Sequence, residues 1–169
     1  MTRIAVEQLL ALVHASFDGD GAHSLMANVR DLRAEDWDWL PPGAERTIRE
    51  IFEHAAIAKY LYAEHMFGTA KRSYADVHGE SPLRARPDDT GGLIAWAREG
   101  HAAFAAGVAS LDDAGLGAPT RRHYGKMDVM DNVVGVMIRH DAYHAGEINH
   151  LRALRHRNDA WFEGLTADS

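Results

Sequence analysis

Two histidines four residues apart, His140 and His144, have the spacing with most chemical potential in this sequence. At about 100° of rotation per residue in an α-helix, both side chains fall on the face that carries an apolar stripe. The residues that share roughly a 100° arc with His140 are Val133, Met137, His144, Glu147, Ile148 and Leu151. Two imidazoles on successive helical turns can bind one metal ion, which then needs one more ligand from elsewhere. The spacing therefore predicts two ligands of a metal site that faces a helical core.

The third ligand is predicted to come from a helix over residues 46–67. By the same rotation, one stripe of this segment contains Thr47, Ile51, His54, Ala58, Leu61 and His65. His54 and His65 are separated by eleven residues, which corresponds to about 16 Å of helical rise, so they cannot bind the same ion. His54 lies between apolar neighbours in the middle of the stripe, whereas His65 is close to Gly68. We therefore select His54 as the candidate ligand.

Composition limits the chemistry of this site. The chain contains no cysteine and eleven histidines, so a metal would be held by nitrogen and oxygen, and a disulfide or a cysteine nucleophile is excluded. The formal net charge of −7 argues against a general binder of nucleic acids. The local run of Arg152, Arg155 and Arg157 fits a solvated helix end, where basic residues complement the helix dipole.

Length and hydropathy favour a single soluble domain over residues 1–169. A chain of 169 residues with 46% hydrophobic residues can bury one core. No apolar run is long enough to cross a bilayer, and Glu7 and Gln8 interrupt the beginning of the chain where a signal peptide would be apolar. We expect a cytoplasmic protein without a membrane partner.

Amphipathic helices with long connections account for most of the chain. The segments with helical periodicity are 4–17, 22–33, 46–67, 93–111 and 127–156. Segment 36–43, with two prolines, is predicted to be a connection, and 68–92 and 112–126 are predicted to be longer loops. Because no segment reads convincingly as a strand, the predicted architecture is an all-α four-helix bundle with long crossover loops.

At these residues the sequence resembles the DinB-like superfamily, the damage-inducible or YfiT-like four-helix bundles. The resemblance covers most of the chain and is carried by segments 37–43, 46–54, 60–68 and 140–149. In that family, one histidine on the second helix and a pair on the last helix bind a divalent metal such as zinc or nickel. The resemblance places these ligands at His54, His140 and His144.

The resemblance implies two classes of function. Some members resemble metal-dependent hydrolases, and others resemble transferases or isomerases that use a low-molecular-weight thiol such as mycothiol or bacillithiol. In the enzymatic interpretation the metal lowers the pKa of water or of an external thiol that attacks a small-molecule substrate. Alternatively, the metal only fastens two helices and the protein acts through dimerisation or a stress-related partner. In either interpretation we expect a homodimer. In a third hypothesis, the protein binds no metal and the three histidines are hydrogen-bonded within the core.

Several residues near the predicted site have more than one interpretation. Glu147 follows His144 on the same side of the helix, so it is a candidate proton acceptor, a fourth ligand or a partner that orients an imidazole. Trp37 and Tyr62 either line a pocket or pack in the core. Asp141 is expected at the helix surface or behind a ligand. The sequence assigns no role to four other histidines: His14, His23, His65 and His101.

Overall fold

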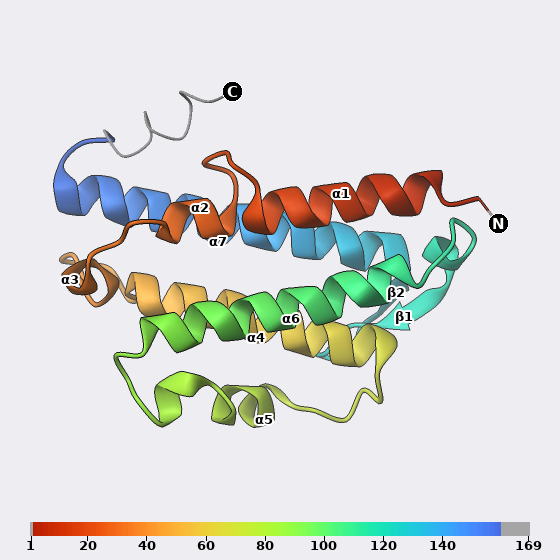
Figure 1. The fold of residues 1–169 in the computed structure, drawn as a ribbon. Helices are drawn as coiled ribbons and strands as arrows, with labels where there is room; N and C mark the ends of the chain where they lie inside the picture. Colours follow the sequence, from red (N-terminus) through yellow and green to blue (C-terminus); the bar gives the residue numbers. More distant parts are fainter. Residues whose placement is uncertain (1, 160–169) are drawn as a thin grey trace.

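Four long helices make up most of the part of the chain that the computed structural model describes, residues 2–159 (Figure 1). They are α1 (Ile4–Asp18), α4 (Ile48–Phe67), α6 (Thr90–Ala109) and α7 (Met130–His156). Helices α1 and α4 each pack against both α6 and α7, which closes the four into a bundle. The all-α four-helix bundle predicted from the sequence is confirmed.

The connections contain short elements. These are α2 (Leu25–Val29), α3 (Ala34–Trp37), α5 (Tyr74–Gly79), the 3₁₀ turns η1 (Pro82–Arg84) and η2 (Gly115–Gly117), and the strands β1 (Pro119–Arg121) and β2 (Met127–Val129). The expectation of no strand was wrong, because β1 and β2 form an antiparallel hairpin directly before α7. Its turn uses Gly125 at φ +90°, a conformation that glycine adopts without strain. Strands of three residues are too short to show an alternating pattern in the sequence.

Local sequence signals fix the ends and the close packing of α4. The Thr47 hydroxyl accepts a hydrogen bond from the backbone N–H of Glu50, while the Glu50 carboxylate accepts one from the N–H of Thr47. This capping box begins the helix, and Gly68 ends it. On the neighbouring α6, a Cβ at Gly100 would lie 2.7 Å from the Tyr60 ring. Glycine at this position therefore permits α4 and α6 to approach closely.

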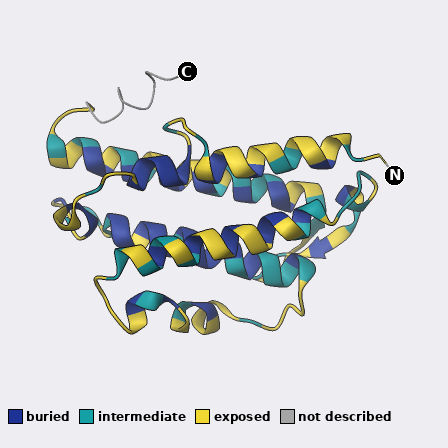
Figure 2. Cartoon of the chain, viewed as in Figure 1, coloured by how far each residue is buried: buried dark blue, intermediate teal, exposed yellow. Residues whose placement is uncertain are grey.

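The core lies between the four helices, and Figure 2 shows their buried residues turned toward one another with exposed residues along the outer sides. Trp37 is 3% exposed and packs edge-on against Phe52, with 5.8 Å between ring centroids. It belongs to the cluster that contains Ile51 and Ile148, so it fills one end of the core. None of the described helices has the length and apolar character required to span a membrane.

A buried ion pair crosses the centre of the bundle. The side chains of Lys59 on α4 and Asp141 on α7 are both fully buried and form a salt bridge. Ser16 on α1 donates a hydrogen bond of 3.3 Å to the same carboxylate oxygen, Oδ2 of Asp141. The expectation that Asp141 lies at the helix surface or behind a ligand was therefore wrong: its partners are a lysine and a serine on two other helices. Removing one member of such a pair leaves an uncompensated buried charge.

Candidate metal centre

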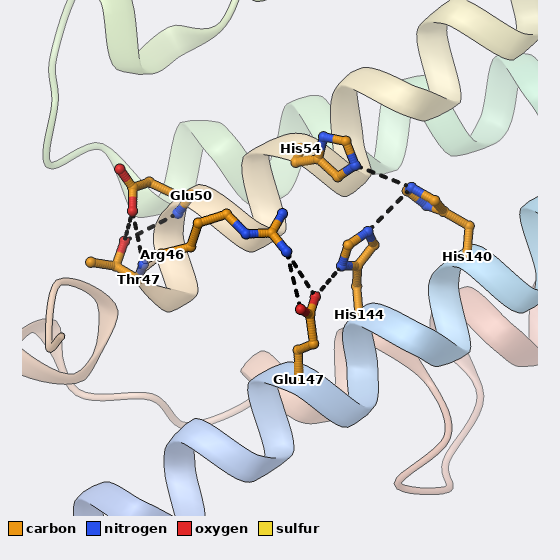
Figure 3. Close-up of polar contacts among 7 residues, drawn as sticks. All are labelled: Arg46, Thr47, Glu50, His54, His140, His144 and Glu147. Atoms are coloured by element: carbon orange, nitrogen blue, oxygen red, sulfur yellow. Dashed lines mark hydrogen bonds and ion pairs between the residues drawn. The ribbon is translucent and has the colours of Figure 1, made fainter. Parts of the chain in front are cut away.

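Three histidine side chains converge between α4 and α7. His140 Nε2 lies 3.3 Å from Nε2 of His54 and 3.2 Å from Nε2 of His144. Figure 3 shows the three rings directed into one space, His54 from one helix and the other two from successive turns of α7. Each ring offers one nitrogen, and these nitrogens lie within 4.8 Å of one another. The structure thus brings together all three ligands predicted from the sequence.

Two of the three separations between these nitrogens match those of a tetrahedral cation site. With Zn–N bonds of about 2.0–2.1 Å, two ligands of a tetrahedral site are separated by roughly 3.3–3.4 Å. The separations of Nε2 of His140 from Nε2 of His54 and from Nε2 of His144, 3.3 and 3.2 Å, are close to that value. Hydrogen bonding alone satisfies the cluster less well, because Nε2 of His140 has either one proton or one lone pair and takes part in both contacts. A cation accepts all three lone pairs at once.

Glu147 fixes the tautomer of His144. Its Oε2 lies 2.6 Å from Nδ1 of His144, and an ionised carboxylate only accepts, so Nδ1 carries the proton. Nε2 of the neutral ring therefore keeps its lone pair for a metal, as in carboxylate–histidine–zinc arrangements. Arg46 donates to Oε1 of the same carboxylate at 3.0 Å (Figure 3). Of the three roles considered for Glu147, this geometry fits the partner that orients an imidazole.

Burial lowers the pKa of all three rings and so favours their neutral form. Burial, together with the neighbouring His144 and His54, lowers the pKa of His140 to about 3. Burial likewise lowers the pKa of His144 to about 3, and it is the main cause of the lowered pKa of His54. Because imidazole binds a metal in its neutral form, a lowered pKa reduces the competition between a cation and the proton of an imidazolium.

A cavity of about 230 Å³ adjoins the site on the side of His54 and His140. Its walls are formed by His54, Ala58, Leu61, Tyr62, Tyr74, His123, Tyr124 and His140. Tyr62 thus lines a pocket, whereas Trp37 packs in the core and is not part of these walls. Tyr74, His123 and Tyr124 were not predicted from the sequence to line this cavity. For His123 and Tyr124, the available signal was a histidine next to a tyrosine in the segment before α7, the helix that carries His140 and His144.

The remaining histidines of uncertain role lie outside the three-histidine cluster. His101 is buried, stacks on Phe17 and has its Nε2 3.0 Å from Nδ1 of His14. Nε2 of His65 lies 2.9 Å from the carbonyl oxygen of Arg72, and His23 is exposed. The structure gives these four residues local packing or surface positions.

A family model described as the DinB superfamily matches residues 20–148, a region that contains all three converging histidines. The chain belongs to the DinB superfamily. No curated protein matches it in a sequence comparison. Within this DinB-superfamily bundle, His54, His140 and His144 form a triad that could hold a metal ion.

Proposed function

We propose that this DinB-superfamily protein is a divalent-metal-dependent enzyme that acts on a small molecule. The observation that carries the proposal is the triad beside a cavity: three imidazole nitrogens converge, and no fourth histidine or carboxylate joins them among the described residues. A site with three protein ligands leaves coordination positions for water or substrate, which is typical of catalytic zinc. Zinc or nickel would suit the three nitrogen ligands.

The proposed reaction is hydrolysis, or transfer of an external low-molecular-weight thiol to a substrate. A divalent metal at the triad supplies Lewis acidity, which makes water or a thiol nucleophilic near neutral pH. The chain's own residues would hold that centre: Glu147 orients His144, and burial favours the neutral form of the three rings. With no cysteine in the sequence, a thiol nucleophile would have to be a separate molecule.

Elemental analysis of protein purified without a histidine tag tests the metal centre. We expect one zinc or nickel ion per chain in the wild type and a large loss in His144→Ala. His23→Ala is the matched control because His23 is exposed and outside the triad. Metal content that is unchanged in His144→Ala would overturn the proposed site.

An activity screen tests the enzymatic role. Metal-loaded protein is assayed for hydrolysis of activated esters and amides and for transfer of thiols to electrophilic substrates. We expect one of these activities in the wild type and in His23→Ala, and its loss in His144→Ala. If metal binds but neither reaction exceeds that of a variant lacking all three histidines, the enzymatic role is refuted in favour of a metal-stabilised bundle.

A further inference from the structure

The described walls of the cavity beside the triad contain aromatic and small apolar side chains and no acidic or strongly basic ones. Apart from two triad histidines, its described lining consists of Ala58, Leu61, three tyrosines and His123, with no lysine, arginine, aspartate or glutamate. Burial is the main cause that raises the pKa of Tyr62 and of Tyr74, so both phenols are neutral at physiological pH. An uncharged ring is therefore better matched to these walls than a charged chain is.

The size of the cavity limits the occupant to about one ring. An apolar cavity of about 150 Å³ in another protein is sufficient for benzene, and drug-sized ligands occupy roughly 300 Å³ or more. The cavity of about 230 Å³ lies between these values. It therefore has room for one substituted six-membered ring.

His123 adds a polar group to the cavity lining besides the two triad histidines. Its Nδ1 is buried and has no hydrogen-bond partner among the described residues. The ring is nearly perpendicular to the rings of Tyr62 and Tyr124, with centroids 5.1 and 5.0 Å away. Such an unpaired buried nitrogen is costly unless a ligand or water completes its hydrogen bond.

The hairpin turn holds His123 in place. The neighbouring Arg122 donates a hydrogen bond of 2.9 Å from Nε to Asp128, and its backbone N–H donates to the carbonyl of Lys126. Burial also lowers the pKa of His123, so its imidazole is neutral and can either donate or accept. His123 is thus a positioned hydrogen-bonding group on a small aromatic pocket.

We propose that this cavity binds a small aromatic molecule, with a metal-binding group directed at the triad and a polar ring substituent hydrogen-bonded to Nδ1 of His123. The inference rests on the proposed metal centre and adds a substrate class to it. In this role His123 is a specificity-determining residue, and the exposed Tyr124 contributes a ring at the cavity rim.

Calorimetric titration of zinc-loaded protein with four hydroxamates tests this inference. Acetohydroxamate carries the metal-binding group alone, benzohydroxamate adds the ring, and the meta- and para-hydroxy derivatives add a polar substituent. We expect benzohydroxamate to bind at least about tenfold more tightly than acetohydroxamate, because the ring is buried against apolar walls. One of the two hydroxy derivatives should bind about fivefold more tightly than benzohydroxamate, because its hydroxyl group completes a hydrogen bond with His123.

Three variants separate the contributions. His123→Phe keeps an aromatic ring but removes Nδ1, so it should abolish the preference for the hydroxy derivative. His23→Phe, at an exposed histidine, is the control and should retain that preference. Tyr124→Ala, at a side chain that is 56% exposed, should reduce the preference for benzohydroxamate over acetohydroxamate without unfolding the protein.

Two results would overturn the inference: equal binding of acetohydroxamate and benzohydroxamate, or a hydroxyl preference that persists in His123→Phe. Failure of the underlying metal centre has a different signature, because zinc would not remain bound and acetohydroxamate itself would give no binding heat. Zinc retention in His123→Phe, measured on the same samples, shows that the triad is intact when the hydroxyl preference is lost.

Discussion

Substituting Glu147 by glutamine perturbs the metal centre without touching a ligand. The carboxylate accepts from Nδ1 of His144 at 2.6 Å and from Arg46 at 3.0 Å. A glutamine has one carbonyl oxygen for two donors, and its amide N–H favours the tautomer of His144 that carries its proton on Nε2. That tautomer cannot bind a metal through Nε2, so Glu147→Gln should weaken zinc binding.

The expected size of the effect follows from the surroundings of Glu147. Loss of a partner that orients a metal-binding histidine typically costs 10- to 100-fold in metal affinity. The Glu147 side chain is 27% exposed and is shared with Arg46, so we expect the lower part of that range. Zinc affinity should fall about 10- to 30-fold, equivalent to roughly 1.4–2 kcal/mol.

Substituting Arg46 by methionine should change the zinc affinity in the opposite direction. Arg46 competes with His144 for the Glu147 carboxylate, and its positive charge lowers the pKa of both His54 and His144. A positive charge that disfavours a protonated imidazole also disfavours a bound cation. Because the Arg46 side chain is 40% exposed, its removal should strengthen zinc binding only about two- to fivefold.

The assay is a competition titration of metal-free protein against a chromophoric zinc chelator at fixed pH and ionic strength. Glu7→Gln is the matched control, because it removes the same charge from an exposed position in the first turn of α1. The reasoning is refuted if Glu147→Gln binds zinc as tightly as Glu7→Gln does. A loss of affinity in Arg46→Met would also contradict it.

Three further predictions concern stability, measured by denaturant unfolding of metal-free protein. Lys59→Met should destabilise the fold by about 3–5 kcal/mol by leaving the Asp141 charge buried alone, and a smaller loss in the Lys59→Met/Asp141→Leu double variant would confirm that cause. Burial lowers the pKa of His101 from 6.5 to about 3, so the unfolded chain binds a proton that the folded chain does not, and stability falls as pH decreases between these values. In His101→Gln, the free energy of unfolding should fall less steeply with decreasing pH than in the wild type, by about 1.4 kcal/mol per pH unit. The prediction is disproved if the unfolding free energies of the variant and the wild type depend on pH in parallel. Gly100→Ala should cost about 1–3 kcal/mol, because the new Cβ meets the Tyr60 ring, and unchanged stability would show that the ring moves aside freely.

The fold and the triad could be predicted because both depend on local periodicity. Residues four apart share a helix face whatever the tertiary structure, so His140 and His144 were placed together by their spacing alone. The stripe on α4 selected His54 for the same reason. The predicted helix over residues 46–67 agrees with α4 (Ile48–Phe67) to within about two residues, the usual uncertainty of helix ends.

Contacts between distant segments could not be predicted in this way. Lys59 and Asp141 are 82 residues apart, and nothing local distinguishes them from solvated charges until the helices are packed. His123 lies in a loop whose place over the cavity depends on a hairpin of two three-residue strands. Pairing of this kind is set by the whole fold and leaves no periodic trace in the sequence.

Lys59 and Asp141 connect the same two helices as His54 and His140, at neighbouring positions along α4 and α7. One connection forms with the fold itself, whereas the other would depend on a bound cation. The distance between α4 and α7 is therefore set before metal enters, and metal uptake requires little rearrangement of the backbone. Exchange of one bound cation for another would then be a local event at three side chains and would not require the bundle to unfold.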